Sequence, residues 1–277
     1  MGIKKISFIL LGSIMLFAQT ETQNSNILVN YDFIQKTEYG GIDWTKGIIV
    51  VTGIGAPNPD LPVAAQRPGA IRAAKLDAFR NVLEIIKGVY IDAQTTVENA
   101  MTASDVISTR IQGIIRNFTV TDIRYMSDGS IEVDVEVPIT GDMTATLLPP
   151  EMGGMNPIIQ PQQGGIYTGL IIDARGLKVQ PAMAPKILTP DGVEVYGTGF
   201  VSHDYAIKMG IVGYAKNFNQ ARQDERVKPN PLIIKGIGVT GTNKTDIIIS
   251  PNDAMKIHQY SENLNFLQQC RVLVIVD

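Results

Sequence analysis

The feature that most constrains this fold is a long amphipathic segment at residues 67–88. Its apolar side chains recur at helical spacing and form one stripe. They are Ile71, Ala74, Ala78, Val82 and Ile86, with Phe79 and Leu83 widening the stripe. Pro68 fits a first helical turn, where a missing N–H costs nothing, and Gly88 follows Lys87, whose charge suits a helix C-terminus. The segment therefore predicts one helix with one buried face.

The rest of the first half predicts strands and a second helix. A continuous apolar run at Ile48–Thr52, between two glycines, is typical of a buried strand, and Gly88–Ala93 alternates enough to predict another. Ser104 is a good N-cap for a second helix. That helix carries Val106, Ile107, Ile111 and Ile114. Residues 118–126 and 131–137, joined by a Ser-Asp-Gly-Ser turn, predict a hairpin.

One face of this predicted hairpin is acidic. Glu132, Asp134 and Glu136 alternate with apolar residues along one strand. Carboxylates at this spacing share a face, so a metal site is one interpretation, but such a row is more often the solvent side of a sheet. We favour the solvent side and expect no metal.

The second half predicts another mixed unit. The apolar run 170–172 predicts a strand, and a hairpin follows around Pro190-Asp191-Gly192, where proline presets the turn and glycine tolerates a positive φ. Residues 204–222 favour a helix. Two further strands are predicted within PLIIKGIGVTG and TDIIIS, and Ser250 and Pro251 mark the start of a last helix that carries Ala254, Ile257, Leu264 and Leu267. The run Val272–Val276 predicts the final strand.

Length and composition place these segments in two domains. The chain has 277 residues, enough for two buried cores, and 44% hydrophobic with 18% charged residues is typical of a globular protein. We therefore predict the α+β class, with two mixed α/β domains at 47–147 and 166–277. Each is expected to be a small sheet with helices packed on it. Residues 148–165, rich in Pro, Gly and Gln, predict the linker.

The start of the chain predicts export. Lys4 and Lys5 precede a short apolar run that ends at Ala18, which favours a signal peptide at 1–18 over a membrane span. Cleavage after Ala18 is one interpretation and a retained anchor is the other. The end of this run has no cysteine, so no direct lipid anchor is expected. Residues 19–46 predict an amino-terminal arm, either flexible or forming an added strand.

Candidate chemistry is sparse. Residues 236–241 spell a dinucleotide-binding fingerprint, but a turn and a strand follow where that mechanism needs a helix. His203 and His258 lack metal-ligand spacing and are interpreted as surface or capping residues. Cys270 is the only cysteine, so no internal disulfide forms, and its position beside a strand predicts a buried, unreactive thiol. We expect no enzyme, no cofactor and, at net charge -3, no nucleic-acid partner.

One pair of charged residues is a candidate contact site. Asp173 and Arg175 lie two apart at the end of a predicted strand and so share a face. Such a pair either holds a loop or grips the carboxylate of a peptide or ligand. The loop-holding interpretation is favoured, and Asp173 and Arg175 remain the candidate partner or ligand contacts.

Several blocks of the sequence have a familiar pattern. In the first half they are AAKLDAFRNVLEIIKGVYIDAQTTVENAM, DVISTRIQGIIRN and DGSIEVDVEVPI. These blocks resemble the bacterial outer-membrane lipoprotein family that includes the flagellar basal-disk protein FlgP, and also the amino-terminal part of the flagellar H-ring protein FlgT. In the second half, YTGLIIDARGLKVQPAMAPKILTPDGVEVYG is similar to the TolB-like middle domain of FlgT. The lipid-bearing cysteine of the lipoproteins has no counterpart at the end of the apolar run.

The resemblance implies a non-enzymatic, exported envelope protein with a structural or assembly role, in a ring around the flagellar basal body or elsewhere in the envelope. Its expected place is the periplasm, in association with the outer membrane. Its expected partners are envelope or flagellar ring proteins and other copies of itself. A physical route is an exposed strand edge, or the apolar arm at Ile27–Ile34, adding to a neighbour. The alternative is a soluble periplasmic ligand- or peptide-binding module, and a hydrolase is the third candidate.

Overall fold

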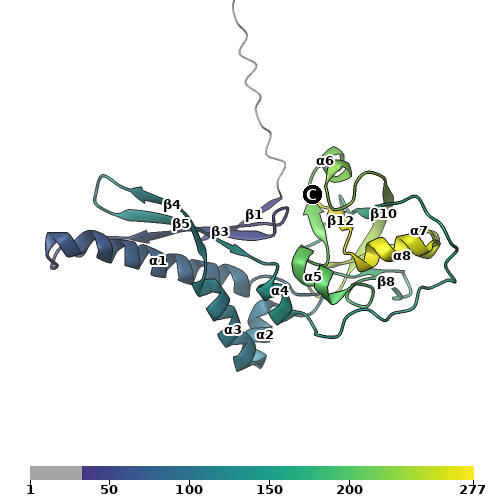
Figure 1. The fold of residues 1–277 in the computed structure, drawn as a ribbon, viewed down its shortest axis with the longest axis horizontal. Helices are drawn as coiled ribbons and strands as arrows, with labels where there is room; N and C mark the ends of the chain where they lie inside the picture. Colours follow the sequence, from purple (N-terminus) through teal and green to yellow (C-terminus); the bar gives the residue numbers. More distant parts are fainter. Residues whose placement is uncertain (1–32) are drawn as a thin grey trace, which may run out of the picture. The chain divides into compact units, whose positions relative to one another are not determined.

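The computed structural model of this chain describes residues 33–277. The predicted signal peptide and most of the predicted arm lie outside the described residues. Helices accompany two separate sheets, which confirms the predicted α+β class (Figure 1). In the residues described, no helix is both long enough and apolar enough to span a bilayer.

The first sheet has five antiparallel strands in the order β1-β2-β3-β5-β4. They are β1 (Ile34–Lys36), β2 (Gly40–Asp43), β3 (Ile48–Gly55), β4 (Thr119–Tyr125) and β5 (Ile131–Pro138). The predicted hairpin at 118–137 is confirmed as β4 and β5. β1 and β2 fall within the predicted arm, and for these residues the added-strand alternative holds.

Helix α1 (Val63–Lys87) packs on one face of this sheet. Its fully buried positions include the predicted Ala74, Ala78 and Val82. Glycine in β3 and alanine in α1 let the backbones of the strand and the helix come into contact. A Cβ at Gly53 of β3 would lie only 2.2 Å from the Ala74 carbonyl oxygen. The helix therefore rests directly on the strand, a contact that only glycine permits.

The predicted start of α1 is wrong by four residues. The helix begins at Val63, where Ala65 N–H and Gln66 N–H both donate to the Pro62 carbonyl. Pro68 therefore lies in the second turn rather than the first. One missing hydrogen bond near a helix N-terminus is tolerated. The proline therefore indicates that a helix begins nearby, but not at which residue.

The helices α2 (Val97–Ala103), α3 (Asp105–Arg116) and α4 (Asp142–Leu147) complete the first half. Ser104 caps α3 as predicted, since its side chain accepts a hydrogen bond from Ile107 N–H at 3.3 Å. The predicted strand Gly88–Ala93 is wrong. It is a set of bends with a single bridging residue, Tyr90, which pairs with Thr96 and with Ala182 of the second half. The alternating pattern correctly indicates which side chains are buried, namely Val89, Ile91 and Ala93. The segment is nevertheless no strand, because Tyr90 forms only isolated bridges.

The second sheet has seven strands in the order β8-β7-β11-β10-β6-β12-β9. They are β6 (Gly169–Asp173), β7 (Ile187–Leu188), β8 (Glu194–Tyr196), β9 (Gly213–Ala215), β10 (Pro231–Thr240), β11 (Asp246–Ile249) and β12 (Val272–Ile275). Its centre is parallel, with β6 between β10 and β12. The predicted Pro190–Gly192 hairpin joins β7 and β8, and the predicted run at 272–276 forms β12.

Helices cover both faces of this sheet. These are α5 (His203–Met209), α6 (Phe218–Gln223), α7 (Pro251–His258) and α8 (Ser261–Gln268). Ile171 of β6 packs with Ala221 of α6, whereas Leu170 and Ile172 on the other face belong to the core that includes Leu267 of α8. Because both faces are covered, β6 is a continuous apolar run rather than an alternating one.

Two helix predictions in the second half are wrong in extent. The single helix expected at 204–222 is divided by the buried strand β9, because Gly210 (φ 74°) ends α5 and residues 213–215 pair with β12. The last helix is divided into α7 and α8. There Gln162 donates its N–H to the Gln259 carbonyl and accepts from Ser261 N–H, so the break is made by a distant segment.

The predicted linker at 148–165 contains no helix or strand. It is nevertheless attached to the second half, because Gly153 N–H donates to the Thr198 carbonyl and Met155 N–H to the Gly199 carbonyl, both in the turn between β8 and α5. The two sheets belong to one compact unit. The segment rich in Pro, Gly and Gln is therefore extended, and backbone hydrogen bonds hold it against the second half of the chain.

Candidate functional site

The predicted contact pair lies at the carboxyl end of β6. Arg175 holds both carboxylate oxygens of Asp173, at 2.8 Å from Nε and 2.6 Å from Nη2. These hydrogen bonds keep the pKa of Asp173 below its usual value. Arg175 also lies over the Phe218 ring. The structure brings the two residues together as one closed pair, and a ligand carboxylate would have to displace Asp173 to use the same guanidinium.

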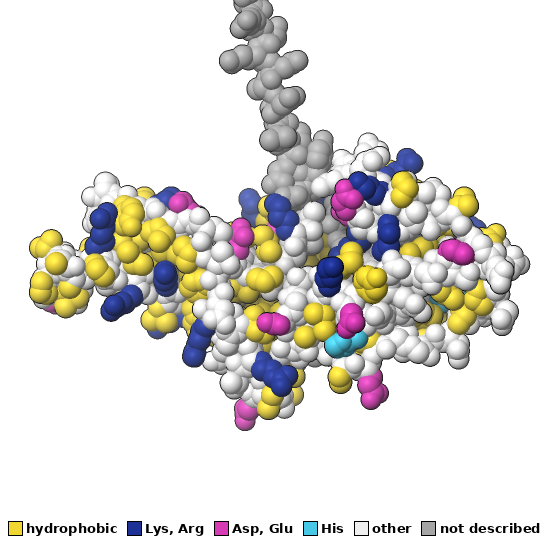
Figure 2. Space-filling model, viewed as in Figure 1, with side chains coloured by type: hydrophobic (Ala, Val, Ile, Leu, Met, Phe, Trp, Pro, Cys, Tyr) yellow, Lys and Arg dark blue, Asp and Glu magenta, His cyan; other side chains and the backbone are white. Residues whose placement is uncertain are grey.

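A groove of about 940 Å³ lies on the first sheet, beside the tip of the β1–β2 hairpin. We call it the edge groove. Its lining includes four exposed hydrophobic side chains, Ile34, Tyr39, Val50 and Ile54, of which Ile54 is 56% exposed. Hydrophobic side chains are visible on the surface over this half of the molecule (Figure 2). Apolar groups gathered in one concave surface are typical of a binding site.

The edge groove follows a strand edge that is only half paired. β2 pairs with β3 from Ile48 to Val51, and the outer edge of Thr52–Gly55 continues beyond it. Two side chains of α1 reach around to this edge. Ile54 N–H donates to Asp77 Oδ2 at 2.9 Å, and the Thr52 carbonyl accepts from Asn81 Nδ2 at 3.3 Å. Side chains therefore bind groups that a neighbouring strand would otherwise bind.

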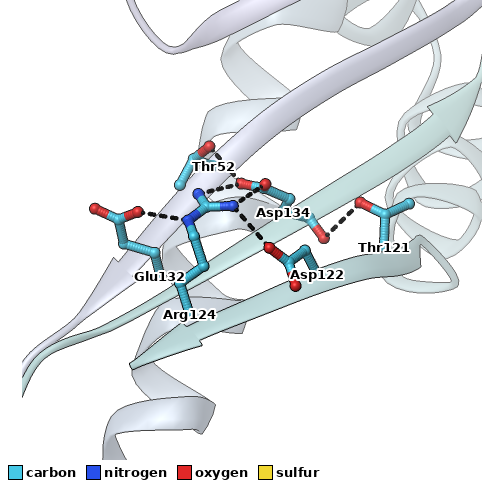
Figure 3. A network of polar contacts seen from close by, with 6 residues as sticks. All are labelled: Thr52, Thr121, Asp122, Arg124, Glu132 and Asp134. Atoms are coloured by element: carbon cyan, nitrogen blue, oxygen red, sulfur yellow. Dashed lines mark hydrogen bonds and ion pairs between the residues drawn. The ribbon is translucent and has the colours of Figure 1, made fainter. Parts of the chain in front are cut away.

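An ion-pair network lies next to the groove on the open face of the sheet (Figure 3). Arg124 of β4 donates to Glu132 at 3.0 Å, to Asp122 at 3.1 Å and to both oxygens of Asp134. Thr52 donates its hydroxyl to Asp134 at 2.6 Å. The hydrogen bonds from Arg124 hold the pKa of Asp134 below its usual value.

Two residues of the acidic row Glu132, Asp134 and Glu136 belong to this network. Glu132 and Asp134 are partly exposed and face the Arg124 guanidinium, so their charges are already compensated. Among residues 33–277, no group of three or more His, Cys, Asp or Glu side chains is placed to hold a metal ion. The row is the solvent-facing side of an antiparallel sheet whose other face is covered by α1.

The two histidines have different environments. His203 is partly exposed at the start of α5. His258 is fully buried, so its prediction as a surface or capping residue is wrong. Its Nδ1 accepts from Ile158 N–H at 3.1 Å, which places the ring proton on Nε2, 2.8 Å from the Val195 carbonyl. Burial lowers the pKa of His258, and the neutral ring fastens the 148–165 segment to β8.

Cys270 is fully buried, as predicted. Burial raises the pKa of its thiol to about 11, so the thiol carries its proton at neutral pH. The half-buried Arg226 beside it donates to the backbone carbonyls of Cys270 and Gly210, at 2.9 and 3.2 Å. This arrangement closes the end of α5 and offers no activated nucleophile. The rejected fingerprint at 236–241 lies in β10 and its turn into β11, with a strand after it.

The edge groove was not found from the sequence. Its signal is nevertheless present, because alternation continues past the predicted end of β3 at Thr52 through Gly53, Ile54 and Gly55. A strand that outlasts its neighbour leaves a free edge. The length of β2 could not be read from the sequence, since β2 lies in the segment 19–46, which predicted an arm.

The comparisons with known proteins concern the second sheet. Residues 169–277 match a family described as the second domain of Treponema pallidum Tp0624. The matched range begins at the first residue of β6 and includes all seven strands of the second sheet. The comparison with curated proteins found no match.

Proposed function

We propose that this chain is a non-enzymatic, exported protein of the bacterial cell envelope that serves as a structural or assembly component. Its place is the periplasm, in association with the outer membrane, and a ring around the flagellar basal body is the specific assembly that the resemblance to FlgP and FlgT suggests. The signal peptide predicted at 1–18 supports export. It works through contact with envelope or ring proteins and with other copies of itself.

The observation that carries this proposal is the half-paired edge of β3. Thr52 and Ile54 present backbone groups to a groove whose exposed side chains are apolar. An extended segment of another protein can pair with such an edge while its side chains fill the groove. Strand addition of this kind gives a stable contact without any reactive group.

The runner-up is a soluble periplasmic ligand- or peptide-binding module. Its support is the size of the edge groove, about 940 Å³, which lies within the range of small-molecule sites. Against it, the groove is bounded by a strand edge and a hairpin rather than enclosed. A hydrolase has weaker support, because the buried thiol and the two histidines are separate.

Site-specific photo-crosslinking in the source bacterium tests the proposed function. A photoreactive residue replaces Ile54 in the groove or, as a matched control, Val106 on α3, which is exposed at 61% and outside the groove. We expect a discrete protein adduct from position 54 and none from position 106, in the periplasmic or outer-membrane fraction. Recovery of the protein in the cytosol, or equal labelling from both positions, contradicts the proposal. A small-molecule adduct in place of a protein favours the runner-up.

A further inference from the structure

The edge groove has the form of an acceptor site for one particular strand. We propose that it receives residues 27–31 of a second copy of this chain, added to β3 as a further strand. The inference rests on the proposed function and specifies the partner that the groove takes. It joins copies head to tail, because each copy then contributes one donor segment and one acceptor groove.

The acceptor edge is held by replaceable contacts. Asp77 binds Ile54 N–H at 2.9 Å and Asn81 binds the Thr52 carbonyl at 3.3 Å, and Asn81 Nδ2 also contacts Asp77 Oδ2 at 3.4 Å. Both side chains are half-buried and do not belong to the buried stripe of α1. An incoming backbone can take over the N–H and the carbonyl while the two side chains turn to solvent and keep each other as partners. The exchange leaves no backbone group unpaired.

The side-chain surface requires an apolar strand. Ile34, Tyr39 and Val50 are 41%, 44% and 36% exposed, and they line the groove together with Ile54. The charged residues of the lining are mainly acidic: Glu38, Asp43, Asp77 and Glu136 against Lys36 and Lys46. An acidic segment is therefore disfavoured, and a neutral one adds no charge that would have to be desolvated.

The sequence contains one segment of that kind next to the described residues. Residues 27–31 are Ile-Leu-Val-Asn-Tyr, with no charge and with Ile27, Val29 and Tyr31 at alternate positions. Strands bring alternate side chains to one face, so these three would face the groove together. Five residues are enough to span the free edge from Thr52 to Gly55.

The described residues favour a second copy as the donor. The chain enters the sheet at Phe33, whose N–H donates to Thr45 Oγ1 at 2.9 Å and whose carbonyl accepts from Trp44 N–H at 2.9 Å. The next residue, Ile34, pairs with Asp43 of β2, and Asp43 pairs on its other side with Ile48, the first residue of β3. The acceptor edge begins at the other end of β3, and β1 runs towards it. The described chain therefore begins at the opposite end of β3 from the acceptor edge, and a segment that ends two residues before Phe33 is attached at that opposite end.

A complementation experiment tests the donor and acceptor separately. Val29→Asp places a charge in the donor segment and leaves the groove intact, whereas Ile54→Asp places a charge in the groove and leaves the donor intact. Val106→Asp is the matched control, because Val106 is also exposed and lies outside the groove. The mass of each purified chain is measured by light scattering during size exclusion, and thermal unfolding checks that each variant is folded.

We expect the unaltered chain and V106D to form oligomers, and V29D and I54D each to be monomeric. An equimolar mixture of V29D and I54D should then form a dimer of twice the monomer mass, since one working donor meets one working groove. A mixture that stays monomeric, variants as oligomeric as the unaltered chain, or an unaltered chain that is itself monomeric overturns the inference. If the chain is monomeric yet position 54 crosslinks to a different envelope protein, this inference fails and the proposed function stands. If the chain forms the expected oligomer but is recovered in the cytosol, this inference stands and the proposed function fails.

Discussion

The two sheets of this protein differ in how many of their faces are covered. The first sheet has α1 on one face, and its strands alternate, so that Val133 and Val135 of β5 are buried while Glu132 and Asp134 are not. The second sheet is covered on both faces, and four of the five residues of β6 are buried. The open face carries the ion-pair network and the edge groove. A sheet that leaves a face and part of an edge uncovered has surface available for partners, whereas a sheet covered on both sides is mainly a scaffold.

The first two predictions have the largest expected effects, and the first of them would break the contact that covers the first sheet. Gly53→Ala places a Cβ 2.2 Å from the Ala74 carbonyl oxygen and 2.4 Å from the Ala78 amide nitrogen, so α1 must move off β3. We expect a loss of about 3 kcal/mol in the free energy of unfolding, measured by denaturant titration. Gly113→Ala on α3 is the matched control, because a Cβ there meets nothing within 4 Å. The control should be neutral or gain up to about 1 kcal/mol, as alanine favours a helix. Equal stability of the two variants would show that α1 does not rest on β3.

The next prediction compares one isoleucine from each sheet. Ile172 of β6 is fully buried, and Ile172→Ala should cost about 2–5 kcal/mol through lost burial and the cavity left behind. Ile54 of β3 is mostly exposed, and Ile54→Ala should change the unfolding free energy by no more than about 0.5 kcal/mol. Both are measured on dilute protein, so that oligomers do not contribute. A large loss from the Ile54 variant would mean that the open face is covered within one chain.

Acid should weaken the second half before the first. The neutral His258 ring accepts from Ile158 N–H, and burial lowers its pKa from the ordinary value of about 6.5. The folded state therefore binds this proton less readily than the unfolded state, and stability falls as pH drops below about 6.5, until the folded state is also protonated. Melting temperatures between pH 7.5 and 5 check this, with His258→Gln expected to flatten the slope. His203→Gln is the control, since the His203 side chain is 42% exposed and His258 is fully buried. If the melting temperature of the His258 variant depends on pH as steeply as that of the unaltered chain, the His258 ring is not the cause of the acid sensitivity.

How much of this could be read from the sequence depends on whether the cause is local. Ser104 as a cap, the turn between β4 and β5 and the stripe of α1 involve residues close in the chain, and these predictions are confirmed. The break between α7 and α8 is made by Gln162, and the middle of the Gly88–Ala93 segment is held by residues near Ala182. Such partners are remote in sequence, so neither capping nor periodicity can indicate them.

The candidate site divides in the same way. Asp173 and Arg175 were recognised because they are two residues apart, and the structure joins them as a pair. The edge groove needed the lengths of β2 and β3 and the reach of Asp77 from α1, which is 23 residues from Ile54. His258 was misplaced on the surface for a related reason, since its two hydrogen-bond partners, Ile158 and Val195, are both far away in the chain.

The smallest expected effect concerns one arginine from each sheet. Arg124 on the open face and Arg175 at the end of β6 both hold carboxylates, and their side chains are 40% and 47% exposed. Exposed pairs lose most of their Coulomb energy to solvent and salt, so Arg124→Gln and Arg175→Gln should each cost far less stability than Ile172→Ala. Arg124→Gln should cost somewhat more, because it leaves Glu132, Asp122 and Asp134 close together without a cation. That excess should shrink in 1 M salt, where denaturant titrations with urea measure both variants. If the two costs are equal at low salt, the three carboxylates around Arg124 do not repel one another appreciably, and the network is no more than a solvated surface.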